Sequence, residues 1–182
     1  MRLILIAASV LSMQAAPIAD YYTFKADTTW TYKRVENGAE RKIAAKVLSN
    51  EGGKLKLDWK EYEKDGGLHD SNTITWSLID GVLTAEARKE GDDNALVFGV
   101  LKDGAKKDDR WTTALGEFVH HGTVELTVPA GTYKNAIKTR LSLGDEGKID
   151  FYLVPKVGLV KIDIHGEGPN TFELSEFKEP KK

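Results

Sequence analysis

The chain has 182 residues, with 26 lysines and arginines against 28 aspartates and glutamates, and it contains no cysteine. The two signs of charge are interspersed and nearly balanced, so the sequence offers no basic surface for a nucleic acid partner. Without cysteine the chain can form no disulfide, thiol nucleophile or cysteine-bound zinc site, and it lacks the lipid-bearing cysteine of a bacterial lipoprotein.

Residues 1–19 predict a secretory signal peptide. Arg2 precedes the apolar run Leu3–Leu11, and small residues follow at Ala15, Ala16 and Ala19. The apolar run is shorter than the roughly 20 residues that a membrane-spanning helix needs. We therefore expect an exported protein, in the periplasm or outside the cell, whose mature chain starts between Ala16 and Asp20. The alternative is a short N-terminal strand or buried helix.

Alternating apolar and polar residues predict successive antiparallel strands in the first half of the chain. Trp30 and Tyr32 share one face of the first strand. Asn37-Gly38 and Asp80-Gly81 each predict a tight hairpin, because both central residues of a type I′ turn need positive φ. Further strands are expected at 41–48, 54–63, 72–78, 82–88 and 95–100, followed by a long polar loop at 101–110.

The most regular region runs from Gly122 to Phe177 and predicts a β-meander. Its turns contain Pro129-Ala130-Gly131 and Pro155-Lys156-Val157-Gly158, and we expect positive φ at Gly131 and Gly158. No segment has the apolar period of a helix. The sequence thus predicts one all-β domain over residues 20–178, with about eleven or twelve strands, and a disordered tail at 179–182. The antiparallel meander would form either a strongly curved sheet or an open barrel.

Catalytic and metal-binding patterns are missing. His120 and His121 are adjacent, so in a regular strand they point to opposite faces and cannot chelate one metal. We expect neither a metal site nor a cofactor. Two acidic pairs could serve as glycosidase carboxylates, although solvated positions are the simpler interpretation: Glu61 with Glu63, and Asp92 with Asp93. No nucleophile elbow or phosphate-binding loop occurs.

The tryptophans are the one suggestive set, namely Trp30, Trp59, Trp76 and Trp111. Core packing is the simpler interpretation of their strand positions. The alternative is that a curved sheet encloses a cavity and that these rings line it for an apolar ligand. We therefore favour a non-enzymatic envelope protein that binds an apolar small molecule or an envelope partner. A secreted hydrolase with a carboxylate-based site is the other hypothesis, and the oligomeric state is left open.

Three segments of the sequence resemble a diffuse family of exported bacterial β-proteins that includes the TapB-like group. They are Tyr21–Tyr32 (YYTFKADTTWTY), Val124–Ala136 around Pro129-Ala130-Gly131, and Phe151–Lys161 around Pro155 and Gly158. Ala26-Asp27 replaces the glycine that usually precedes the tryptophan. The shared motifs are turns and strand starts, so the resemblance implies a curved antiparallel sheet and no activity. The group is loosely similar to the curved sheets of lipoprotein carriers, which implies at most a capacity for apolar ligands.

Overall fold

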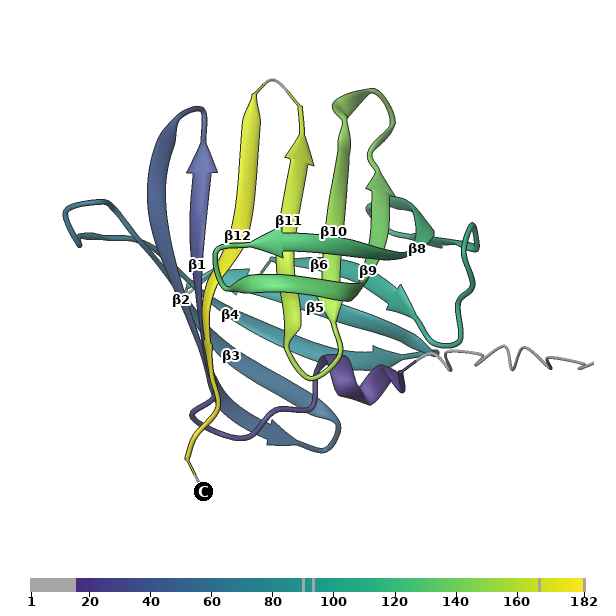
Figure 1. The fold of residues 1–182 in the computed structure, drawn as a ribbon, viewed down its shortest axis with the longest axis horizontal. Helices are drawn as coiled ribbons and strands as arrows, with labels where there is room; N and C mark the ends of the chain where they lie inside the picture. The colour runs from purple at the N-terminus through teal and green to yellow at the C-terminus, as the bar shows by residue number, and fades with distance from the viewer. Residues whose placement is uncertain (1–15, 90, 93, 167, 182) are drawn as a thin grey trace, which may run out of the picture.

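The structure is a computed structural model that describes residues 16–89, 91–92, 94–166 and 168–181. Most of the predicted signal peptide and one member of an acidic pair, Asp93, lie outside these residues. The described chain forms twelve antiparallel strands in one sheet, which confirms the predicted all-β class (Figure 1). The strands are β1 (Thr29–Glu36), β2 (Ala39–Glu51), β3 (Lys54–Tyr62), β4 (Leu68–Ile79), β5 (Val82–Lys89), β6 (Ala95–Lys102), β7 (Arg110–Thr113), β8 (Gly116–Val128), β9 (Gly131–Ser142), β10 (Lys148–Val154), β11 (Gly158–His165) and β12 (Pro169–Lys178).

Two meanders share this sheet. The order is β6-β5-β4-β3-β2-β1-β12-β11-β10-β9-β8-β7, so each strand lies beside its neighbour in sequence except where the first strand meets the last. That junction runs from Thr29 opposite Lys178 to Glu36 opposite Asn170. The hairpin turns follow the predicted chemistry, with positive φ at Asn37, Gly38, Asp80 and Gly81.

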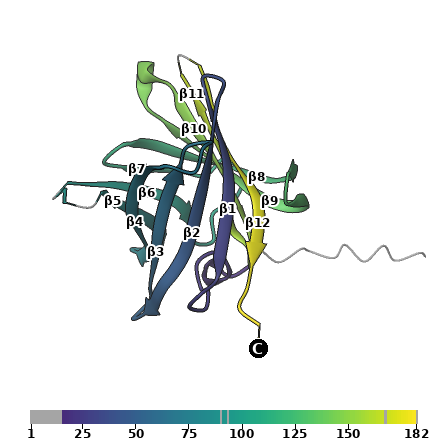
Figure 2. The same ribbon diagram turned by 90° about the vertical axis from the view of Figure 1, so that its left-hand side faces the viewer.

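The sheet curls into a nearly closed barrel (Figures 1 and 2). Its two edge strands do not pair along a ladder. Instead, Trp111 Nε1 donates a hydrogen bond to the Gly99 carbonyl at 2.8 Å, and Thr139 Oγ1 donates one to the Val100 carbonyl at 2.8 Å. A Cβ at position 99 would lie 2.9 Å from Thr113 Cγ2, so the glycine permits this close approach of β7 to β6. Side chains therefore close the barrel.

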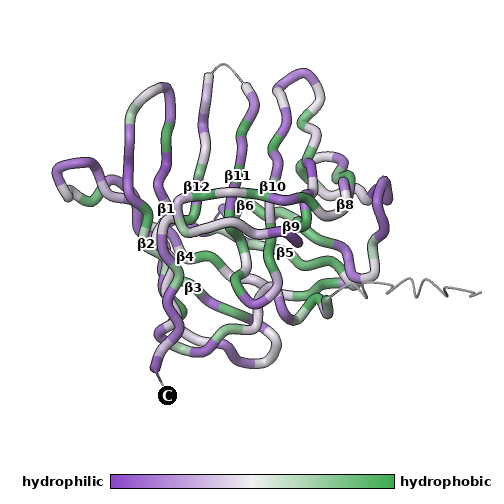
Figure 3. Tube along the Cα trace, in the orientation of Figure 1, coloured by the Kyte–Doolittle hydropathy of each residue, from purple (hydrophilic) through white to green (hydrophobic). Residues whose placement is uncertain are grey.

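Period-two alternation places the apolar side chains on the inner face. On β2, for example, Ile43, Ala45 and Val47 are buried while Lys42 and Lys46 are exposed on the other face. Figure 3 shows the same alternation of apolar and polar residues along most strands. Because burying this inner face is the main favourable contribution to folding, the pattern fixes which side of each strand faces the core.

One end of the barrel is closed by the chain that precedes β1 (Figure 2). A 3₁₀ turn, η1 (Ile18–Tyr21), packs there with Ile18 only 8% exposed. The Lys156 N–H donates to the Asp20 carbonyl at 2.6 Å, and Phe24 packs edge-on against Trp30 with ring centroids 4.9 Å apart. The packed chain thus includes residues on both sides of position 20, where the sequence places the start of the domain.

The β8–β9 hairpin fills a gap where the sheet divides. Pairing between β11 and β12 extends only as far as Lys161 opposite Glu173. Beyond that point the turn of the hairpin reaches β12, and the Ala130 N–H donates to the Leu174 carbonyl at 2.9 Å. In Figure 1 the hairpin crosses the adjoining strands at a steep angle. Gly131 and Gly158 have φ of 140° and 84°, which confirms the positive φ expected at both turns.

A candidate ligand cavity inside the barrel

A cavity of about 360 Å³ lies inside the barrel, between the strands β3 to β6 on one side and β10 to β12 on the other. This volume falls at the lower end of the range for small-molecule sites, about 300–1,000 Å³. Its walls are mainly apolar: Trp59, Ile74, Trp76, Ala85, Ala87, Leu96, Phe98, Val100, Ile149, Phe151, Leu159, Ile162, Ile164 and Phe172.

Two alanines on β5 leave room for this cavity. Ala85 lies between Trp76 on β4 and Phe98 on β6, and Ala87 lies between Ile74 and Leu96. A larger side chain at either position would project into the space that the neighbouring large side chains surround. Leu96, which lines the cavity, is 58% exposed, so the cavity reaches the surface beside β6.

The four tryptophans occupy different places. Trp59 and Trp76 line the cavity, and Trp59 packs against Tyr32 with ring centroids 5.3 Å apart. Trp30 is not among the residues that line it; its ring packs at the closed end, where Nε1 donates to the Val157 carbonyl at 2.7 Å. Trp111 stacks on Phe118 and takes part in barrel closure.

The sequence analysis did not single out three further aromatic residues that line the cavity. The rings of Phe98 on β6 and Phe151 on β10 pack against each other at the cavity wall with centroids 6.1 Å apart, and Phe172 lines the same space. Phe98 lies in the continuously apolar run 95–100, whose two faces the pattern does not distinguish. Phe151 and Phe172 occupy apolar positions of alternating strands, so their strand faces were predictable. The meeting of β6 with β10 was not, because the closure depends on contacts between residues distant in sequence.

The polar part of the lining comes from Arg34, Glu61, Asp70 and Asn72. Arg34 Nη1 donates to both carboxylate oxygens of Glu61, at 3.0 and 2.8 Å. Glu61 is 5% exposed, so the expectation that it is solvated was wrong. The alternation places it on the inner face, where partners of opposite charge offset the cost of burying its carboxylate.

Further charged residues extend this pair into a network. Arg34 Nη2 donates to Glu36 at 2.7 Å, and Arg41 Nη1 donates to Glu36 at 2.9 Å and to Glu61 at 3.4 Å. Arg41 Nε donates to Glu63 at 3.2 Å. We name the set Arg34, Glu36, Arg41, Glu61, Glu63 the rim network, because it lies toward the end of β1 opposite Trp30 and includes polar residues of the cavity.

The two carboxylates that line the cavity, Asp70 and Glu61, are poorly suited to act as general acids. A hydrogen bond from Lys89, together with one from Asn72, outweighs partial burial and lowers the pKa of Asp70 below its ordinary value. A general acid needs a raised pKa to carry a proton near neutral pH. Both oxygens of Glu61 already accept hydrogen bonds from arginine. The geometry therefore supports binding better than hydrolysis.

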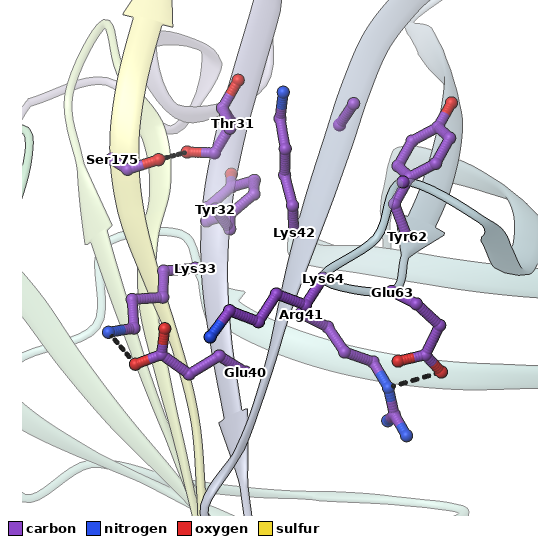
Figure 4. A pocket seen from close by; sticks show the side chains of 12 residues that line it. Thr31, Tyr32, Lys33, Glu40, Arg41, Lys42, Tyr62, Glu63, Lys64 and Ser175 are labelled. Atoms are coloured by element: carbon purple, nitrogen blue, oxygen red, sulfur yellow. Dashed lines mark hydrogen bonds and ion pairs between the residues drawn. The ribbon is translucent and has the colours of Figure 1, made fainter.

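A second hollow, of about 590 Å³, lies over β1, β2 and the end of β3 (Figure 4). It is larger than the inner cavity, but charged side chains surround it, including Arg41 and Glu63 of the rim network, and several of these are paired. Lys33 forms an ion pair with Glu40, and the Ser175 hydroxyl donates to the Thr31 carbonyl at 3.0 Å. It lacks the apolar walls that bury a ligand, so the inner cavity is the better candidate site.

The outer face carries a second buried ionic cluster, centred on Asp150. Arg140 donates to its carboxylate at 2.6 and 2.8 Å, Lys138 Nζ lies 2.9 Å away and His165 Nε2 lies 3.1 Å away. Burial alone would raise the pKa of Asp150, but the hydrogen bonds from Arg140 and Lys138 hold it well below its usual range. Asp150 is therefore a permanently charged structural anion at neutral pH.

Comparisons with known proteins identify the fold. No protein-family model and no curated protein matches the sequence. A solved structure of a candidate lipoprotein from Parabacteroides distasonis is similar over 91% of this chain and all of its own, with a TM-score of 0.65 and 14% identity. The protein shares this fold. A candidate exported protein with a YmcC-like fold from Bacteroides fragilis is similar over 87% of this chain and 99% of its own, with a TM-score of 0.60 and 12% identity.

In the part of the chain that the structure describes, no helix is both long enough and apolar enough to cross a membrane. The same residues contain no group of three or more histidine, aspartate or glutamate side chains arranged to hold a metal ion.

Proposed function

We propose that this protein is an exported, non-enzymatic binding protein that holds an apolar, lipid-like ligand in the cavity between β3–β6 and β10–β12. The observation that carries the proposal is the cavity itself, which has apolar walls, polar groups in one part of its lining and an exposed leucine where it reaches the surface. Ligand sites typically combine such walls with a few polar groups that fix orientation.

The size of the cavity narrows the ligand class. A water molecule's share of liquid volume is about 30 Å³, so 360 Å³ has room for on the order of a dozen water-sized groups. That suits one medium-length hydrocarbon chain or a compact ring system rather than a complete two-chain lipid. Export is proposed from the signal-peptide pattern of residues 1–19, and the descriptions of the two similar structures as exported or lipoprotein agree with it.

Native mass spectrometry of protein purified from its own host tests the proposal directly. We expect a co-purifying apolar molecule of the mass of a single-chain lipid. Displacement of phenylnaphthylamine, an uncharged fluorescent probe, by decanol would measure binding in solution. A protein that carries no ligand and binds neither compound would contradict the proposal, and turnover of an ester or glycoside by stringently purified protein would support the hydrolase hypothesis instead.

A pair of matched variants locates the site. Ala87→Phe places a ring in the cavity and should abolish probe binding while the protein stays folded. Ala44→Phe makes the same change on the outer face of β2, where the side chain is half-buried away from the cavity, and should leave binding unchanged. Equal binding by both variants would show that the ligand occupies another surface. Circular dichroism would verify that each variant is folded.

A further inference from the structure

The polar part of the cavity contains one cation whose donors are already engaged. The Arg34 guanidinium donates to Glu61 through Nη1, to Glu36 through Nη2 and to Asn170 through Nε at 3.4 Å. Its plane also lies over Phe172, with Cζ 4.8 Å from the ring centroid. An anionic ligand group would have to compete with two carboxylates for this guanidinium, and displacing either one would leave it unpaired in a partly buried position.

The balance of charges around this part of the cavity also disfavours an anionic ligand. The rim network has two arginines against three glutamates, and the neighbouring pair Lys89–Asp70 adds one charge of each sign. Carboxylates thus outnumber the cations around this part of the cavity by one. Nδ1 of His69 lies 2.7 Å from Glu63 Oε1, so this imidazole is also already paired with the network.

Acceptor groups, in contrast, are still available. A carboxylate has about four lone-pair positions, and among the residues that the structure describes the Glu61 oxygens receive three hydrogen bonds, from Arg34 and Arg41. Asn72, which lines the cavity, uses its amide nitrogen to donate to Asp70 at 3.0 Å, and that bond does not engage its carbonyl oxygen, which is a hydrogen-bond acceptor. A ligand group that donates hydrogen bonds would therefore find partners here.

We propose that the rim network selects against anionic ligands, so that the occupant is a single-chain amphiphile with an uncharged or cationic, hydrogen-bond-donating head group such as a hydroxyl or an amine. This inference rests on the proposed function and narrows it to a class of ligand. The hydrocarbon chain lies between the apolar walls, and the head group faces Glu61, Asp70 and Asn72.

A set of three decyl compounds tests the selectivity on the full mature protein at about pH 8, where a carboxylic acid is ionised and an aliphatic amine is protonated. The measurement is displacement of phenylnaphthylamine by decanol, decylamine and decanoate. We expect decanol and decylamine to displace the probe and decanoate to be at least tenfold weaker. Decanoate binding as tight as decanol binding would overturn the inference.

Charge-removing variants attribute the effect to the rim. Glu61→Gln removes one anion and releases donors of Arg34, so decanoate should bind at least tenfold tighter than it binds wild-type protein, while decylamine weakens. Asp70→Asn, at a more exposed position, should shift affinity in the same direction by a smaller factor and serves if Glu61→Gln does not fold. Glu40→Gln makes the same charge change on the outer face and should leave all three affinities unchanged.

The outcomes separate this inference from the function on which it rests. If the probe and all three decyl compounds fail to bind, the cavity is not a ligand site and both proposals fall. If all three bind with similar affinity, or if Glu61→Gln and Asp70→Asn leave the ratio of decanoate to decanol affinity unchanged, the cavity binds ligands but the rim does not select them.

Discussion

The two ends of β1 belong to regions of opposite character. At its start, Trp30 packs against Phe24 and Phe177 with ring centroids 4.9 and 5.6 Å apart, and the chain before the strand covers these rings. At its other end, Arg34 and Glu36 belong to the rim network. All of these strand residues lie on the inner face, so one regular alternation supplies both the sealed core and the polar part of the cavity lining.

The apolar end of β1 contributes mainly to the stability of the fold, and the charged end contributes mainly to ligand selectivity. Apolar burial at the Trp30 end contributes free energy of folding roughly in proportion to the area removed from water. A partly buried ion network contributes much less net stability, because the desolvation of its charges offsets their attraction. We therefore expect substitutions at the closed end to affect unfolding most, and substitutions at the rim to affect ligand choice.

The largest effect is expected for Trp30→Ala. Removing a buried indole from a well-packed site should lower the free energy of unfolding by about 3–5 kcal/mol. Trp30→Phe keeps a ring but leaves the Val157 carbonyl without its indole donor, and it should cost less, about 1–3 kcal/mol. Urea unfolding followed by circular dichroism measures both. Equal losses for the two variants would mean that the hydrogen bond, rather than the packing, dominates at this end.

A smaller, pH-dependent effect is expected for Asp150→Asn on the outer face. Replacing this carboxylate should cost on the order of 2–3 kcal/mol near neutral pH, because Arg140 and Lys138 lose their charged partner. The folded-state pKa of Asp150 lies below its unfolded value, so the stabilisation is complete above about pH 4 and is lost as the pH falls further.

The pH dependence provides the control for that variant. The difference in unfolding free energy between wild-type protein and Asp150→Asn, measured by urea titration at several pH values, should shrink as the pH drops below about 4. A difference that stays constant between neutral and acidic pH would show that Asp150 stabilises the fold by packing and not by charge.

Substitutions at two turn glycines test how much the packing of the N-terminal segment contributes to stability at the closed end. Both Gly131 and Gly158 have positive φ, where a Cβ costs roughly 1 kcal/mol. Nothing lies within 4 Å of a Cβ built on Gly131, whereas at Gly158 it would lie 3.2 Å from the Phe24 ring and 3.3 Å from the Tyr21 carbonyl oxygen. Gly158→Ala should therefore lower the melting temperature more than Gly131→Ala, by a few degrees.

Ligand affinity measured well below the melting point should be the same for both glycine variants, since neither residue lines the cavity. A loss of probe binding by Gly158→Ala without a loss of stability would make this turn part of the site. Equal melting temperatures for the two variants would show that the N-terminal segment contributes little to the closed end.

The local sequence pattern was sufficient to predict the strands and turns, because each of these depends on residues that are neighbours in sequence. The alternation around Ile43 and the Asn37-Gly38 turn are both realised, and the apolar run from Ala95 forms the predicted strand β6. The polar segment expected at 101–110 is shorter than predicted, since β6 extends to Lys102 and β7 begins at Arg110.

Contacts between residues distant in sequence determine the features that local sequence pattern did not predict. Ile18 lies within the predicted range of cleavage sites, Ala16 to Asp20, and local pattern gives it no core position; in the structure it packs in the core, because the chain before β1 folds back onto the β10–β11 turn. Glu61 lies in an alternating strand whose inner face is otherwise apolar, and no local signal shows that Arg34 and Arg41 will surround it. The cavity itself depends on Ala85 and Ala87 facing a wall contributed by strands at least 60 residues later, such as Phe151 and Ile162.

The smallest effect is expected at Lys33, immediately before Arg34 but on the opposite face of β1. Its ion pair with Glu40 joins two largely exposed side chains, and solvent and salt screen such pairs almost completely. Lys33→Ala should thus change the melting temperature by on the order of a degree or less and leave the preference for decanol over decanoate intact. Arg34→Ala is the matched change on the inner face: it leaves Arg41 as the one cation that Glu36 and Glu61 share, and it should lower stability measurably and weaken decanoate binding further. If the two variants behaved alike in thermal melts and in probe displacement, the faces of β1 would not differ in role, and the division between a solvated outer surface and a selective inner rim would be wrong.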